Sequence, residues 1–227
     1  MTTERQTPTY DRLDRALYSF AEADRLANVT PGTSRRWLKG YHYWYSPEER
    51  RVSLAITPHS GLREGVSFID LVEVIVAGRL RARNFSLTRI KQINEYCQLV
   101  LRKPRPLVTE TFKTSGRDVF IQASSGYLLN VLHQAGMQAW DEVLDPFLKD
   151  LDYEDEIARR WWPLGKEREV VVDPDYGFGL PVIAGSGVRT EIIAERARAG
   201  DSTDEIVYDF GVNPKQIQDA LSYEKAA

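Results

Sequence analysis

The segment Tyr18–Tyr41 constrains the fold of this chain most strongly, because its pattern predicts two short helices joined by a tight turn. Ser19 is followed three residues later by Glu22, which is the spacing of a capping box at the start of a helix. Apolar residues then recur at helical spacing, until the sequence Asn-Val-Thr-Pro-Gly over 28–32 stops the helix with turn-forming residues. A second helix is expected to begin near Thr33.

The second helix is expected to carry a basic outer face. Trp37 and Leu38 are predicted to point inward, which leaves the polar and cationic residues outward. A helix that follows a short turn and exposes Arg and Lys has the geometry of a recognition helix in the DNA major groove. The alternative is an ordinary helical hairpin with a solvated basic face. The DNA-contacting residues predicted on this helix are Thr33, Ser34, Arg35, Arg36 and Lys39.

Residues 42–58 are rich in aromatic and β-branched residues on either side of the sequence Ser-Pro-Glu-Glu over 46–49. This pattern predicts two short strands joined by a turn, in the position of the wing of a winged helix-turn-helix. Arg50 and Arg51 are then placed near the wing tip, within reach of DNA phosphates. A solvated loop is the alternative.

Beyond the wing, apolar periodicity predicts helices over 66–83 and over 86–102. The segment 107–122 is expected to form a β-hairpin, with Thr-Ser-Gly over 114–116 as its turn, and 127–151 is expected to be mostly helical. The fold class expected is mainly α with short β-hairpins: a winged helix-turn-helix domain over 1–105, an α/β connecting region over 106–168, and a small helical domain over 169–227.

The last domain is predicted to begin with a strand at 170–172 and to continue with three helices, over 191–199, 202–210 and 215–223. These helices carry little positive charge, so packing between subunits is favoured over contact with a DNA groove. A domain this small is expected to leave apolar faces unburied and to form a homodimer through them. The residues concerned are Ile192, Ile193, Ile206, Val207, Ile217 and Leu221.

Charge is distributed unevenly along the 227 residues: residues 1–120 hold 20 Lys and Arg against 13 Asp and Glu, and residues 121–227 hold 10 against 20. A basic first half suits a polyanion, and an acidic second half suits self-association or a basic partner. Cys97, the single cysteine, cannot form an internal disulfide, which fits a reducing, cytoplasmic setting. No apolar run reaches the length of a membrane span, and the first residues are polar, unlike a secretory signal.

No pattern in the sequence predicts an active site. The three histidines are scattered over different predicted elements, and no cluster has the spacing of metal ligands. The sequences Gly-Phe-Gly at 177–179 and Gly-Ser-Gly at 185–187 lack the context of a phosphate-binding loop and are interpreted as tight turns. Asp173 and Asp175 flank a proline, which favours a turn over a catalytic pair. We therefore expect no catalytic residue, no metal and no cofactor.

Two stretches resemble known families. Tyr18–Lys91, which ends in the sequence LRARNFSLTRIK, resembles the DNA-binding domain of MerR-type regulators. Glu169–Glu224 resembles the antitoxin-associated domain-of-unknown-function family 433. The matching residues there are Asp173-Pro174, Gly179-Leu180-Pro181-Val182, the glycine turn before Arg189, Ala199-Gly200-Asp201-Ser202, Glu205-Ile206, and Ala220-Leu221 with Tyr223. In this order, the two stretches are similar to a VapB-type antitoxin of the long subgroup.

The resemblance implies an antitoxin of a type II toxin–antitoxin system, which binds its own promoter DNA and neutralises a PIN-like ribonuclease toxin. For the toxin contact, Arg196 and Arg198 are candidate cations, and Asp152–Trp162 offers an acidic and aromatic surface. The alternative is a ligand-responsive MerR-like transcription regulator without a toxin partner. In that case a small apolar pocket is expected among Phe112, Phe120, Trp140 and Phe147.

Overall fold

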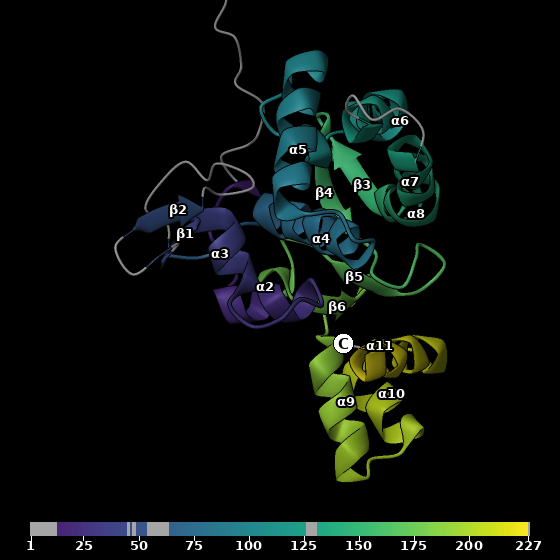
Figure 1. Cartoon of the computed structure of the whole chain (residues 1–227). Helices are drawn as coiled ribbons and strands as arrows, with labels where there is room; N and C mark the ends of the chain where they lie inside the picture. Colours follow the sequence, from purple (N-terminus) through teal and green to yellow (C-terminus); the bar gives the residue numbers. More distant parts are fainter. Residues whose placement is uncertain (1–12, 45, 47–48, 54–63, 126–130, 227) are drawn as a thin grey trace, which may run out of the picture. The chain divides into compact units, whose positions relative to one another are not determined.

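The computed structural model describes residues 13–44, 46, 49–53, 64–125 and 131–226. The chain is mostly helical, with one two-stranded and one four-stranded sheet among these residues (Figure 1). It forms two compact units. Unit 1 comprises Met1–Lys149 with Glu154–Ala158, and unit 2 comprises Asp150–Tyr153 with Arg159–Ala227. The predicted connecting region 106–168 contributes residues to both units.

Unit 1 begins with the two helices expected from the sequence, α2 (Phe20–Leu26) and α3 (Thr33–Lys39). The capping box forms as predicted, because Glu22 N donates to Ser19 Oγ and Ser19 N donates to Glu22 Oε2. The two predicted strands follow as β1 (Tyr41–Trp44) and β2 (Arg50–Ser53), paired antiparallel.

The next two helices are also present, as α4 (Phe68–Ala82) and α5 (Leu87–Leu101), with Ser67 and Ser86 as their N-caps. Helix α4 is buried on nearly every side, and α5 buries one face that includes Cys97. Burial raises the pKa of the Cys97 thiol to about 12. A short 3-10 turn, η1 (Pro106–Val108), then leads to the next helix.

The hairpin predicted over 107–122 is wrong, because these residues lie mostly in helix α6 (Glu110–Ser125). Thr109 starts the helix, and its Oγ1 accepts a hydrogen bond from Phe112 N. Gly116 serves packing instead of a turn, since a Cβ at this position would lie 2.5 Å from the Phe112 ring. Phe112 and Phe120, eight residues apart on the helix, are both fully buried. Burial of this face outweighs the turn-forming preference of the Thr-Ser-Gly sequence.

The remainder of unit 1 consists of α7 (Val131–Ala139), a π-helical turn η2 (Trp140–Leu144) and α8 (Asp145–Lys149). The Trp140 ring lies 5.2 Å from that of Phe112 and 5.7 Å from that of Phe120. Phe147 is fully buried as well. These four aromatic side chains therefore belong to the buried core of unit 1.

Unit 2 contains most of the four-stranded sheet, in the order β3 (Leu151–Glu154), β4 (Ile157–Trp161), β5 (Val170–Val172), β6 (Pro181–Ile183). Strand β5 pairs antiparallel with both β4 and β6. A 3-10 turn, η3 (Gly177–Gly179), joins β5 to β6. Three helices then follow near their predicted positions, drawn in green to yellow in Figure 1: α9 (Thr190–Ala199), α10 (Thr203–Phe210) and α11 (Pro214–Ala226).

These three helices bury most of their apolar faces within unit 2. Ile193, Ile206 and Ile217 are at most 3% exposed and form one core with residues of β6 and the α10–α11 turn. Val207 and Leu221 pack against the same core and are partly buried. The expectation that this domain cannot bury its own apolar faces is therefore wrong, and a homodimer would need another surface.

A buried ionic cluster in unit 1 is centred on Arg105, which lies just before η1. Its guanidinium contacts Asp70 at 2.7 Å, Glu73 at 2.5 Å and Asp14 at 3.0 Å. Asp70 and Glu73 are only 1% and 3% exposed, although both are acidic. Burial opposes the charge on Arg105, but the attraction and hydrogen bonds of Glu73 and Asp70 outweigh it and raise the pKa of Arg105.

We predict that Arg105→Ala destabilises the protein by about 3–5 kcal/mol, because it leaves two buried carboxylates without their cation. Arg117→Ala is the matched control, since Arg117 pairs with Asp141 on the surface, with its side chain 43% exposed. Loss of a surface pair costs about 1 kcal/mol or less. Urea denaturation of both variants measures the difference, and similar small losses for the two would contradict the role given to Arg105.

Candidate nucleic-acid interface

The turn between α2 and α3 is held by the buried carboxylate of Asp24. Its Oδ2 accepts from Gly32 N at 2.6 Å and its Oδ1 from Ser34 N at 2.7 Å. Gly32 itself has φ of 80°, a conformation that suits glycine. Asp24 therefore satisfies backbone donors at the start of α3, and it fixes the position of α3 relative to α2.

Two of the predicted DNA-contacting residues are buried, so their expected exposure is wrong. Ser34 is fully buried, and its hydroxyl donates to the carbonyl oxygen of Phe20 at 3.0 Å. Thr33 is 4% exposed, and its hydroxyl is hydrogen-bonded to that of Thr30 at 2.8 Å. Both side chains lie in the seam between the two helices, where their hydroxyls find partners within the protein. They position α3 and do not present a surface to a ligand.

The three cations of α3 are exposed, as predicted. Arg35 and Lys39 lie over the Phe20 ring, with the charged groups 5.6 and 5.2 Å from its centroid. Arg36 donates to Thr33 Oγ1 at 3.3 Å. Within the described residues, none of the three forms an ion pair with a carboxylate. This small surface thus keeps its positive charge, which is the electrostatic requirement for binding phosphates.

The wing residues Arg50 and Arg51 lie in β2, beside the turn of the hairpin. Their backbones pair in register with Trp44 and Tyr43 of β1. The backbone therefore carries both arginines next to the tip of the predicted wing.

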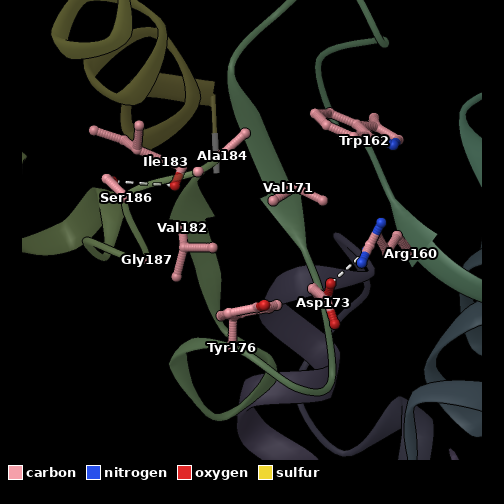
Figure 2. Close-up of a pocket in the computed structure, with 11 residues that line it drawn as sticks. Arg160, Trp162, Val171, Asp173, Tyr176, Val182, Ile183, Ala184, Ser186 and Gly187 are labelled. Atoms are coloured by element: carbon pink, nitrogen blue, oxygen red, sulfur yellow. Dashed lines mark hydrogen bonds and ion pairs between the residues drawn. The ribbon is translucent and has the colours of Figure 1, made fainter. Parts of the chain in front are cut away.

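Unit 2 contains a second candidate site, a cavity of about 330 Å³ on one face of the β4–β5–β6 sheet. Figure 2 shows Arg160 on β4, Trp162 just after it, and Asp173 beside Arg160 at the end of β5. Tyr176 lines the cavity from the β5–β6 connection, and the glycine turn 185–187 also borders it. Arg160 Nε contacts Asp173 Oδ2 at 2.5 Å, and this hydrogen bond raises the pKa of Arg160.

The β5–β6 connection next to the cavity presents an unusual aromatic residue. Phe178 has φ of 58° and ψ of 30°, a left-handed conformation that costs a non-glycine residue about 1–2 kcal/mol. Its side chain is nevertheless 85% exposed. Hydrogen bonds from Tyr176 N to Asp173 O at 3.0 Å and from Gly179 N to Tyr176 O at 2.9 Å hold the connection in place.

The two cations proposed for a toxin contact differ in their surroundings. Arg196 is paired with Asp201 and, at 2.6 Å, with Asp209, and it packs against the Phe210 ring. It is therefore not an available cation. Arg198 is exposed on α9 and forms no ion pair with any residue that the structure describes.

The described part of the chain offers neither a metal site nor a membrane span. Among these residues, no group of three or more His, Cys, Asp and Glu side chains could hold a metal ion. None of the described helices is both long and apolar enough to span a bilayer.

Residues 170–223 match the family model described as "Protein of unknown function (DUF433)". This match confirms the resemblance noted for the last part of the sequence. It covers β5, β6, α9, α10 and most of α11, so the cavity wall and the Phe178 connection both fall largely within the matched region. The resemblance of the first part to MerR-type regulators remains a prediction.

Two proteins of Mycobacterium tuberculosis are similar to this chain over nearly its whole length. One, named "Putative antitoxin VapB45", is 26% identical over 92% of this chain and 94% of its own length. The other, "Uncharacterized protein Rv2308", is 25% identical over 94% of this chain and 92% of its own. The crystal structure of Rv2018 from the same organism has the same fold, with a TM-score of 0.68 and 24% identity over 92% of this chain and 99% of that chain.

We predict that Asp24→Ala destabilises unit 1 by about 1–3 kcal/mol, because two backbone N–H groups at the start of α3 lose their acceptor. Arg25→Ala is the control, since it changes the neighbouring exposed residue of the same helix. Its effect is expected to stay within about 0.5 kcal/mol. Thermal unfolding of the two variants tests this, and an Asp24→Ala protein as stable as the control would refute the role of Asp24.

Proposed function

We propose that this chain is the antitoxin of a type II toxin–antitoxin system, which binds its own promoter and neutralises a PIN-like ribonuclease toxin. The observation that carries the proposal is the similarity, over nearly the whole chain, to a protein named as an antitoxin. The DUF433 match at the end of the chain supports the same class. A homodimer is part of the proposal, because a two-fold protein matches a palindromic operator.

DNA binding is assigned to α3 and to the β1–β2 hairpin. Exposed Arg35, Arg36 and Lys39 support this assignment, since they carry unneutralised charge on one short helix held by a tight turn. Arg50 and Arg51, the predicted wing residues in β2, are assigned to the same interface. Arginine contacts to guanine edges contribute about 1–3 kcal/mol each to base discrimination, and phosphate contacts make binding fall with salt.

We predict that Arg35→Ala/Arg36→Ala weakens binding to a fragment of the protein's own promoter at least tenfold and lowers the slope of affinity against salt concentration. Lys113→Ala/Arg117→Ala removes the same two charges from α6 and serves as the control. Fluorescence anisotropy over a salt series gives both quantities. Equal losses in the two double variants would assign the binding to net charge, and unchanged binding by the α3 variant would exclude α3.

Toxin neutralisation is assigned to unit 2. The toxin expected from the resemblance is a ribonuclease whose clustered carboxylates hold a divalent metal. An exposed cation complements such a surface, and Arg198 is available where Arg196 is already paired. Unit 1 is the less suitable partner surface, because its free cations on α3 are proposed to contact DNA.

We predict that Arg198→Glu weakens the complex with the toxin at least tenfold, because a repelling charge replaces an attracting one. Lys225→Glu makes the same charge change at an exposed position of α11 and is the control. Copurification with the product of the neighbouring gene, and rescue of growth on co-expression, measure the effect. Full rescue by Arg198→Glu would place the toxin contact elsewhere, while promoter binding tests the other half of the proposal separately.

A further inference from the structure

Phe178 combines two features that no contact within the described residues explains. Its backbone is left-handed, between two glycines that also have positive φ of 55° and 76°. A phenylalanine usually avoids this conformation, and it is retained where the surroundings make the position necessary. Burial of the ring does not supply that reason, because the side chain is 85% exposed. The connection therefore exposes a large apolar ring to water.

The cavity beside this connection is large enough for such a ring. An apolar cavity of about 150 Å³ holds benzene, and the cavity on the sheet face measures about 330 Å³. Val171 and Val182 pair across β5 and β6 and form its floor, and Trp162 and Tyr176 line it (Figure 2). Phe178 is not among the lining residues, so its own ring does not fill the space.

The charges around the cavity are paired with each other. Arg160, the cation that lines the cavity, contacts Asp173, which lines it as well. The face is thus locally neutral, which suits neither a DNA backbone nor the carboxylate cluster of a ribonuclease. Two copies of a neutral face can approach each other without repulsion, and an exposed ring close to a cavity that fits it can be self-complementary, as a two-fold interface requires.

We infer that a second copy of this chain docks on this face, with Phe178 of each copy inserted into the cavity of the other between Trp162 and Tyr176. The inference rests on the homodimer of the proposed function and names its surface. This docking surface takes the place of the apolar helix faces through which the sequence predicted dimerisation, because those faces are largely buried within unit 2.

Loss of the ring is the first test. The full-length Phe178→Ala protein is expected to have a dimer dissociation constant at least tenfold higher than the unaltered chain, measured by sedimentation equilibrium. Tyr208→Ala is the matched control, because Tyr208 is 89% exposed in unit 2 but does not line the cavity. Phe178→Gly separates association from folding: glycine relieves the left-handed backbone, so the monomer is expected to be at least as stable while the dimer weakens.

Mixing variants tests the reciprocal contact directly. A Phe178→Ala copy keeps an intact cavity and a Trp162→Ala copy keeps an intact ring, so their mixed dimer retains one of the two contacts. It is expected to form more tightly than either variant's own dimer. No preference for the mixed dimer would overturn the proposed insertion, as would a Phe178→Ala protein that dimerises normally.

Two further outcomes distinguish this inference from the proposed function. A monomeric wild-type chain that still binds its promoter would overturn the docking surface and leave DNA binding intact. A monomeric chain whose toxin complex is broken by Phe178→Ala would show that the toxin occupies this face, which overturns the second copy as occupant and supports the antitoxin role.

Discussion

The contact of Arg105 with Asp70 and Glu73 is the interaction on which unit 1 most depends, because it supplies a cation to two carboxylates buried inside the protein. Asp70 also belongs to the capping box of α4, where its side chain accepts from Ser67 N at 3.0 Å. The N-terminus of α4 is thus connected, through Asp70, to Arg105 in the segment before η1. Such a cluster stabilises the fold only when it is complete, since a buried carboxylate without its partner is strongly destabilising. Helices α2 and α3, which position the predicted DNA surface, both contact α4.

The proposed DNA surface on α3 and the proposed docking surface in unit 2 differ in whether their cations are paired with carboxylates. On α3 the three cations lie over an aromatic ring or beside a hydroxyl, and no described carboxylate neutralises them. In unit 2 Arg159, Arg160 and Arg196 all contact carboxylates. Positive charge is therefore available where a polyanion is expected to bind, and is cancelled where a second copy is proposed to dock.

The elements that the sequence predicted well are those governed by neighbours in the chain. The capping box at Ser19 forms as expected, because it is complete within four residues. The β1–β2 hairpin and the three last helices also follow from local spacing and turn residues. The error over 107–122 has a physical cause. The Thr-Ser-Gly sequence favours a turn locally, but Gly116 is needed for the close approach of the Phe112 ring, which only the packed helix shows.

Local sequence alone determined where helices start, which face of α3 carries cations, and that the last domain resembles a known family. It could not determine which side chains at the helix seam are buried, so Ser34 was expected on the surface. It also gave no sign of Asp24 as the residue holding the turn, because its partners lie eight and ten residues away. The partners of Arg105 and the cavity beside Phe178 arise from segments still further apart. These features were decided only by the tertiary structure, because the burial and the partner of a side chain depend on which distant segments pack around it.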